Sequence, residues 1–250
     1  KEKALIESEM VADFGKKAGS IKGSICGDYE FYGINSRRPR HKEGDSEFCW
    51  ENFGGYRKEV EYFRELAKII EKYDYCLSLN ALKKGELLPK GILIAGPPGT
   101  GKTRLARTFC NEACVPFEMF GVSDVGSSFV YETSNNVQRK FDAAASYIRN
   151  GESRVAVLFI DELDSLGRTR SRSSGAGSED DKVVTALNCN MDGHLAVDGV
   201  MVIGATNLQE AIDPALVRPG RFEKRVCMGQ LTADDSKDIF SKYLRGCDGI

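Results

Sequence analysis

The sequence predicts a three-layer α/β fold built on a five-stranded parallel sheet, and two observations support this prediction. Short apolar runs alternate along the chain with longer segments of helical periodicity, the order expected when helices cover both faces of a sheet. Most of the short runs are apolar throughout, as strands buried on both faces are. The predicted strands are Ile92–Ala95, Phe117–Phe120, Val155–Ile160, Val200–Gly204 and Val226–Met228.

Helical periodicity fills the intervals between the strands. Apolar residues recur there every three or four positions, which is the spacing of one helix face. The predicted helices run over about 57–73, over 104–109, through Val137 to Ile148, and over about 180–191. Ser134 is the predicted N-cap of the third helix and Asn150-Gly151 its stop, while Gly193 follows the fourth.

The composition is that of an ordinary globular protein. Of the 250 residues, 41% are hydrophobic and 29% charged, and the net charge is −2, so neither nucleic acid nor an anionic membrane is expected as a partner. No apolar run approaches the roughly 20 residues of a membrane helix. The eight cysteines form no CxxC pair, which favours a reducing intracellular compartment, either the cytoplasm or an organelle stroma or matrix. Membrane attachment through residues outside this chain stays open.

Three segments are expected along the chain. Residues 1–49 form an N-terminal extension or linker without an assigned role, and its basic run at 35–42 is either a docking patch or a solvated linker. Residues 50–230 form the α/β core domain. From Thr232 the pattern is purely helical, so residues 231–250 are expected to begin a helical domain that the sequence does not complete.

The stretch that organises the site is Gly96-Pro97-Pro98-Gly99-Thr100-Gly101-Lys102-Thr103, between the first predicted strand and a helix that begins at Arg104. A strand, a glycine-rich turn and Lys-Thr at a helix start form a phosphate-binding loop, whose N–H groups surround phosphates at the positive end of the helix dipole. Lys102 is expected to reach the β- and γ-phosphates and Thr103 to bind Mg²⁺. The expected nucleotide-binding residues are this loop and Arg104. A simple connecting turn is the alternative, and both flanks argue against it.

Two acids follow the third predicted strand, about 60 residues after the phosphate loop. Asp161 is expected to hold Mg²⁺, directly or through a water, and Glu162 to polarise the attacking water as general base. Acids often end strands, so the pair is informative because of the loop that precedes it. The prediction from these residues is a P-loop NTPase fold that binds a nucleoside triphosphate together with Mg²⁺.

Polar residues of two further segments are candidates for the same chemistry. Asn207 ends the fourth predicted strand and could orient the water or sense the γ-phosphate, or could cap the next turn. Asp213 is the predicted N-cap of a short helix that Pro219-Gly220 breaks. Arg218 and Arg221 bracket the break and either stabilise transition-state charge on a phosphoryl group or are solvated surface arginines.

These segments together resemble the AAA ATPase family. The phosphate loop, VLFIDELD at 157–164, GATN at 204–207 and DPALVRPGRFEKRV at 213–226 stand in the family's order. The resemblance runs from about Trp50 to the end of the chain and is greatest to the ATPase module of FtsH-type membrane proteases. It implies a ring hexamer with nucleotide bound between subunits. Arg218 and Arg221 match the arginine fingers that reach the neighbour's nucleotide, and Asn207 matches sensor 1.

Other implied positions concern the nucleobase and the ring centre. Phe53 and Gly54 stand where the family lines its adenine pocket, and Tyr243 stands where many members carry a stacking histidine. Phe129-Val130-Tyr131 matches the pore loop that grips an unfolded polypeptide, although Tyr131 replaces a glycine and Phe129 could equally be a core residue. The run 168–178 matches a second pore-facing loop or is a plain surface loop.

The sequence therefore predicts an ATPase that acts on protein substrates as a motor, inside an FtsH-like protease. A stand-alone unfoldase or complex-disassembly ATPase is the first alternative. A nucleotide-gated scaffold that binds ATP without threading substrate is the second, and Glu162, Asn207 and both arginines argue against it.

Overall fold

The structure, a computed structural model, describes residues 47–73, 88–121, 132–166 and 179–244. All of these belong to one of the two units into which the chain divides, Arg37–Ile250. Most of the predicted extension, the segment Phe129-Val130-Tyr131 and the loop 168–178 lie outside the described residues.

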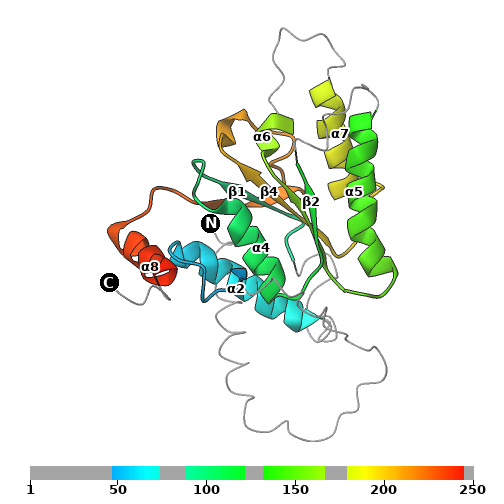
Figure 1. The fold of residues 1–250 in the computed structure, drawn as a ribbon. Helices are drawn as coiled ribbons and strands as arrows, with labels where there is room; N and C mark the ends of the chain where they lie inside the picture. Colours follow the sequence, from blue (N-terminus) through cyan, green and yellow to red (C-terminus); the bar gives the residue numbers. More distant parts are fainter. Residues whose placement is uncertain (1–46, 74–87, 122–131, 167–178, 245–250) are drawn as a thin grey trace, which may run out of the picture. The chain divides into compact units, whose positions relative to one another are not determined.

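Five parallel strands form one sheet in the order β2-β3-β4-β1-β5 (Figure 1), so the predicted parallel sheet is confirmed. The strands are β1 (Gly91–Ala95), β2 (Phe117–Phe120), β3 (Ala156–Ile160), β4 (Val200–Thr206) and β5 (Phe222–Cys227). The last strand was predicted to begin at Val226, but it begins at Phe222. Its residues 223–225 are charged and exposed, which suits an edge strand but hides the apolar pattern.

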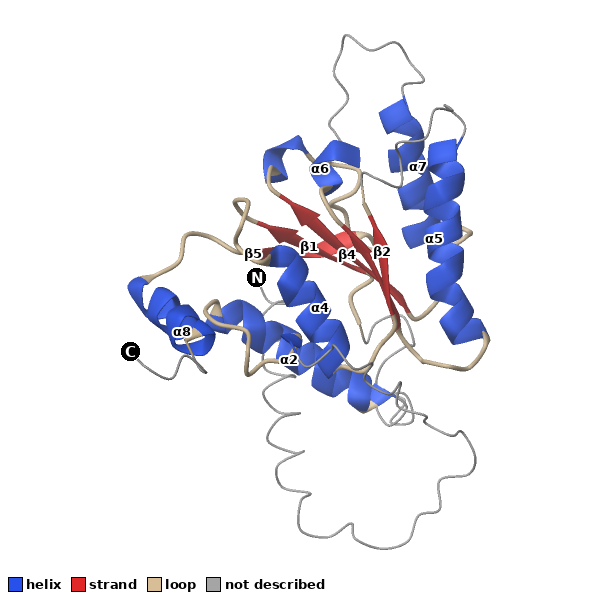
Figure 2. Cartoon of the chain, in the orientation of Figure 1, coloured by secondary structure: helices blue, strands red, loops and turns tan. Residues whose placement is uncertain are grey.

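Helices cover both faces of the sheet (Figure 2), so the three-layer architecture is also confirmed. On one face lie α2 (Arg57–Glu71) and α4 (Lys102–Glu112), where the fully buried rings of Phe63 and Phe109 have centroids 5.1 Å apart. On the other face, α5 (Glu132–Arg149) and α7 (Glu179–Met191) pack against β2, β3 and β4 through residues such as Phe141 and Leu187. Successive residues of β3 alternate between these two cores, as the strand pleat requires.

The two ends of α5 test the predicted helix signals. The N-cap prediction is wrong, because the helix begins at Glu132 and Ser134 lies inside its first turn. Serine is tolerated inside a helix as well as at its cap, so this residue alone does not fix where the helix begins. The predicted stop is confirmed: Gly151 has φ 72°, and the N–H groups of Gly151 and Glu152 donate to the carbonyls of Ile148 and Tyr147.

Short elements join the later strands. α6 (Leu163–Leu166) follows β3, and the 3₁₀ helix η4 (Gln209–Ala211) follows β4. The short helix predicted from Asp213 is instead a turn, in which the Leu216 N–H donates to the Asp213 carbonyl at 2.9 Å. The Asp213 carboxylate still acts as a cap, because it accepts from the Ala215 N–H at 2.7 Å.

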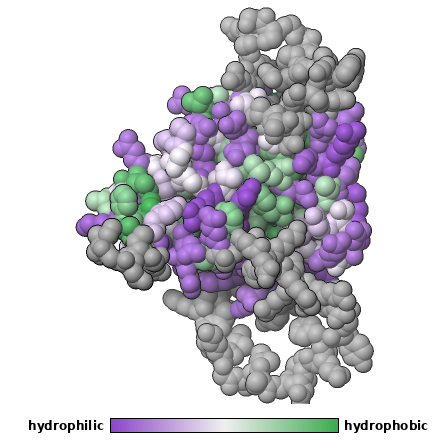
Figure 3. All heavy atoms as spheres, viewed as in Figure 1, coloured by the Kyte–Doolittle hydropathy of each residue, from purple (hydrophilic) through white to green (hydrophobic). Residues whose placement is uncertain are grey.

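The last described helix is α8 (Ala233–Tyr243). It begins with a capping box, in which Thr232 and Asp235 each accept a backbone N–H of the other. Its surface is partly apolar (Figure 3), because the side chains of Phe240 and Leu244 are 65% and 50% exposed. Across the described ranges, each helix is too short or too polar to cross a bilayer.

Candidate active site

The candidate site lies where three neighbouring strands end. β1 runs into the loop 96–101, β3 into Asp161 and β4 into Asn207, and the sheet order places β4 between the other two. The carboxyl ends of parallel strands share one edge of a sheet, where ligands of such folds bind. The register pairs Ala95 with Thr206 and Ile160 with Gly204, so the predicted residues meet at this edge.

Two glycines of the loop have backbone conformations that other residues rarely adopt. Gly99 and Gly101 have φ of 79° and 89°, both in the left-handed region. Gly96 is constrained by space, because a Cβ there would lie 2.2 Å from the Met228 carbonyl oxygen. The loop thus turns tightly between β1 and the first residue of α4, Lys102.

The ammonium of Lys102 joins the loop to Asn207. Its Nζ donates to the carbonyl oxygens of Gly96 and Pro97 at 2.7 and 2.8 Å, and to Asn207 Oδ1 at 2.7 Å. Burial lowers the pKa of Lys102, and the charges of Asp161 and Asp164 oppose that shift. Lys102 and Asn207 were predicted to act at one site, and the structure brings them together.

The predicted metal ligands are also adjacent. Thr103 Oγ1 donates to Asp161 Oδ2 at 3.1 Å. A hydroxyl and a carboxylate are hard oxygen donors, and Mg²⁺ binds through one or two protein oxygens together with phosphate oxygens and waters. Within the described ranges, no three His, Cys, Asp or Glu side chains gather into a larger metal cluster. The donor set therefore fits Mg²⁺ held jointly with a nucleotide.

Glu162 has an unusual backbone. Its φ is 49°, a left-handed value that strains a residue with a side chain, and its N–H donates to Asp161 Oδ1 at 3.0 Å. Its side chain is exposed at the end of β3. Strain of this kind often accompanies functional residues, and here it turns the chain sharply after the metal ligand.

Asp164 is a buried residue that the sequence analysis did not assign. Its Oδ1 accepts from Thr206 Oγ1 at 2.8 Å and from the Asn207 N–H at 3.1 Å. The side chain is 9% exposed although it carries a charge. The motif DELD contains a third acid, Asp164, beside the buried Leu163. A charged residue in such an apolar setting is the signal that could have identified this position.

The two candidate arginines differ in their contacts. The Arg221 Nε donates to Asp192 Oδ2 at 2.7 Å, and its Nη1 donates to the Ala215 carbonyl at 2.7 Å. Arg218 is exposed, and no hydrogen bond or ion pair to its guanidinium is found among the described residues. The contacts found in the described part of the chain do not join either arginine to the phosphate loop.

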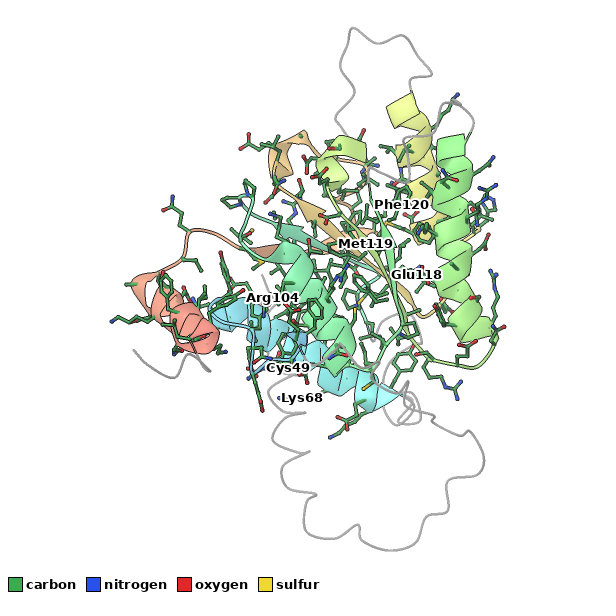
Figure 4. All side chains as sticks on the ribbon, viewed as in Figure 1. Cys49, Lys68, Arg104, Glu118, Met119 and Phe120 are labelled. Carbon is green, nitrogen blue, oxygen red and sulfur yellow. The ribbon has the colours of Figure 1, made fainter. Side chains whose placement is uncertain are left out.

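The predicted adenine-side residues fall into two groups. Arg104 lies on α4 (Figure 4) and contacts Tyr243. A guanidinium nitrogen of Arg104 donates to the Tyr243 phenol oxygen, and the Arg104 Cζ lies 5.3 Å from the ring centroid. Phe53 is 5% exposed and belongs to the core beneath α2. At Gly54 a Cβ would lie 2.7 Å from the Ile239 Cα, so α8 approaches this backbone closely.

A phosphate loop after one strand, with an acid pair after a nearby strand, defines a P-loop nucleoside triphosphatase. Residues 92–230 match the model of the ATPase family associated with various cellular activities (AAA). The chain therefore belongs to the AAA family of ATPases, which use ATP with Mg²⁺.

Similar proteins share the name "ATP-dependent zinc metalloprotease FtsH". That of Ruminiclostridium cellulolyticum is 36% identical over 216 residues, or 84% of this chain and 32% of the relative. That of Acidobacterium capsulatum is 41% identical over 182 residues, or 72% and 27%. That of Halothermothrix orenii is 31% identical over 220 residues, or 88% and 33%. The chain thus spans about a third of the length of these relatives.

Proposed function

We propose that this chain is the ATP-hydrolysing motor module of an FtsH-like protease, and that it couples hydrolysis to unfolding and translocation of protein substrates. The observation that carries the proposal is the convergence of Lys102, Thr103, Asp161 and Asn207 at one edge of the sheet. The similarity to FtsH over most of the chain supports the choice of an FtsH-like motor.

In this proposal, the phosphates lie in the loop 96–101 and over the start of α4. Lys102 binds the β- and γ-phosphates, for which its three donors are suited. Thr103 and Asp161 would hold Mg²⁺, and the ion would supply positive charge beside the phosphoryl oxygens. Arg104 and Tyr243 lie on the side of the nucleobase, with the backbone of Phe53 and Gly54 nearby.

Glu162 acts as the general base that takes a proton from the attacking water. Glu162 follows Asp161 directly and its N–H donates to the Asp161 carboxylate, so the same backbone turn sets the positions of the base and the metal ligand relative to each other. Asn207 orients the same water through its side-chain amide. Hydrolysis then transfers the γ-phosphoryl group to that water and releases ADP and phosphate.

Replacing the base tests this assignment. Glu162→Gln removes the proton acceptor and keeps the shape, so turnover should fall by about 10²–10⁴-fold, the usual contribution of a general base. ATP affinity should stay unchanged, because Glu162 does not hold phosphate in this scheme. Steady-state turnover and calorimetric binding on the full-length protein measure both quantities. Glu71→Gln, at an exposed position at the end of α2, is the matched control. Parent-level turnover by Glu162→Gln would contradict the assignment.

The larger assembly is also a proposal. The chain would form a hexameric ring in which Arg218 and Arg221 act as arginine fingers, and Phe129-Val130-Tyr131 would grip the polypeptide. We place it in a reducing compartment, and the five cysteines among the described residues are free thiols. A stand-alone unfoldase is the alternative. ATP-dependent degradation of an unfolded model protein by the full-length protein favours the protease, whereas unfolding without cleavage favours the alternative.

A further inference from the structure

We propose that Asp164 is a positioning residue of the active site, which fixes Asn207 and, through Asn207, the ammonium of Lys102. The inference rests on the proposed function, because it explains how residues of that same site are held in place. Asp164 itself does not touch the reacting atoms in this scheme.

The contacts of Asp164 fix the backbone at the end of β4. One carboxylate oxygen accepts from two consecutive residues, the hydroxyl of Thr206 at 2.8 Å and the N–H of Asn207 at 3.1 Å. The Thr206 hydroxyl oxygen in turn accepts from the Leu208 N–H at 3.0 Å. The Thr206 hydroxyl group thus accepts one hydrogen bond and donates the other to Asp164. Hydrogen bonds to a charged acceptor are stronger than those between neutral groups. The backbone on both sides of Asn207 is therefore held.

The Asn207 side chain links the fixed backbone at the end of β4 to the phosphate loop. Its Oδ1 accepts from Lys102 Nζ at 2.7 Å. The three residues thus form a relay from the end of β3, across β4, to the loop after β1, which are neighbours in the sheet. A backbone shift at Asn207 would move both its own amide and the donor that faces the phosphates.

Burial explains why a loss at Asp164 would matter. Thr206 is 1% exposed and Lys102 8%, so little water can replace a missing hydrogen bond. Asp164 therefore supports Lys102 by geometry, through Asn207.

A double-mutant cycle on the full-length protein tests the relay. Asp164→Ala should lower kcat by about 10²-fold, the penalty of a small misplacement in an active site, and change the KM for ATP much less. Asn207→Ala should lower kcat to a similar degree. The double variant should be no slower than Asn207→Ala alone, because Asp164 acts through Asn207. A purely structural role would instead make the two losses multiply, and that result would overturn the proposal.

A conservative variant separates the hydrogen bonds of Asp164 from its charge. Asp164→Asn keeps an oxygen that can accept both hydrogen bonds, so it should recover kcat to within about tenfold of the parent. Asp142→Asn, at an exposed position on α5, is the matched control for a lost carboxylate. Urea unfolding of each variant checks the fold. If Asp164→Ala does not fold, Thr206→Val, which removes one of the two donors, enters the cycle in its place.

The outcomes distinguish this proposal from the proposed function. Parent-level turnover by Asp164→Ala, with Asn207→Ala impaired, would overturn the relay alone. Parent-level turnover by Asn207→Ala would overturn the role of Asn207, and the relay with it. A parent protein that binds Mg²⁺–ATP and does not hydrolyse it would overturn both proposals.

Discussion

The guanidinium groups of Arg218 and Arg221 lie three residues apart and are held in different ways. Arg221 is tied within its own chain, by an ion pair to Asp192 and by a hydrogen bond to the Ala215 carbonyl. Arg218 is exposed next to Pro219. A group that must reach a nucleotide on another subunit has to extend from the surface, and Arg218 meets that condition. Besides its proposed role as a finger, Arg221 holds the turn that presents Arg218.

This difference predicts that only one of the two alanine variants loses stability. Arg221→Ala leaves Asp192 and a carbonyl without their charged donor, so the free energy of unfolding should fall by about 1–3 kcal/mol. Arg218→Ala should leave it unchanged within about 0.5 kcal/mol, as surface substitutions do. Urea unfolding monitored by circular dichroism measures both values. Equal stability of the two variants would contradict a structural role for Arg221.

At the scale of elements, α8 is attached to the segment that leads into α2. The Gly55 N–H donates to Asp238 Oδ2 at 2.8 Å, and the Tyr56 N–H donates to Asp235 Oδ1 at 3.0 Å. The Lys242 ammonium contacts Asp238 at 3.6 Å and also donates to the carbonyl of Phe53. The three hydrogen bonds to Phe53, Gly55 and Tyr56 join residues about 180 positions apart, so they hold the last described helix beside the proposed nucleobase side of the site.

Asp235 offers a direct test of this attachment. Its hydrogen bonds with Thr232, and then that with Tyr56, lower its pKa below the ordinary 3.8. Such a group stabilises the fold above its unfolded pKa, and the stabilisation is lost as the pH falls through the lower folded pKa. Asp235→Ala should destabilise the fold by about 1 kcal/mol at neutral pH, as the loss of a helix cap does. The difference from the parent should shrink below pH 3.8.

A matched control is available in the same turn of α8. Asp234 also lies in the first turn but is largely exposed, with only a distant ion pair to Lys237. Asp234→Ala removes the same charge from the helix N-terminus, so the helix-dipole effects cancel in the comparison. Hydrogen exchange at the Tyr56 amide should accelerate in Asp235→Ala alone. Equal acceleration in both variants would show that the carboxylate contact to Tyr56 is unimportant.

Local sequence patterns predicted most elements but not the contacts between them. Apolar runs identified all five strands, and the glycines before Lys-Thr identified the phosphate loop, because each signal depends on a few neighbouring residues. β5 was predicted too short, since an edge strand tolerates the charges at 223–225. The relay from Asp164 to Lys102 could not be predicted, because it depends on β4 lying between β3 and β1. The pairing of Arg221 with Asp192 likewise depends on tertiary structure.

At the scale of the whole molecule, one chain supplies the phosphate loop with the proposed metal ligands and base, but its exposed Arg218 has no contact to them among the described residues. A site completed by a neighbour explains this separation, because a heterologous contact repeated around a ring gives every site the same partner. Arginine fingers in GTPases contribute about 10³–10⁵-fold to turnover. The assembled protein should therefore hydrolyse ATP far faster than a single chain.

Mixing two inactive variants tests completion by a neighbour. An Arg218→Ala subunit keeps its own Glu162, and a Glu162→Gln subunit keeps its own Arg218. Each homogeneous ring should be nearly inactive, since every site lacks one of the two groups. In rings assembled randomly from equal amounts, about a quarter of the sites should combine an intact base with an intact neighbouring arginine. Turnover should therefore rise on co-assembly to a sizeable fraction of the parent value. Mixed rings as inactive as the separate variants would mean that Arg218 acts within its own subunit, because no mixing could then restore a complete site.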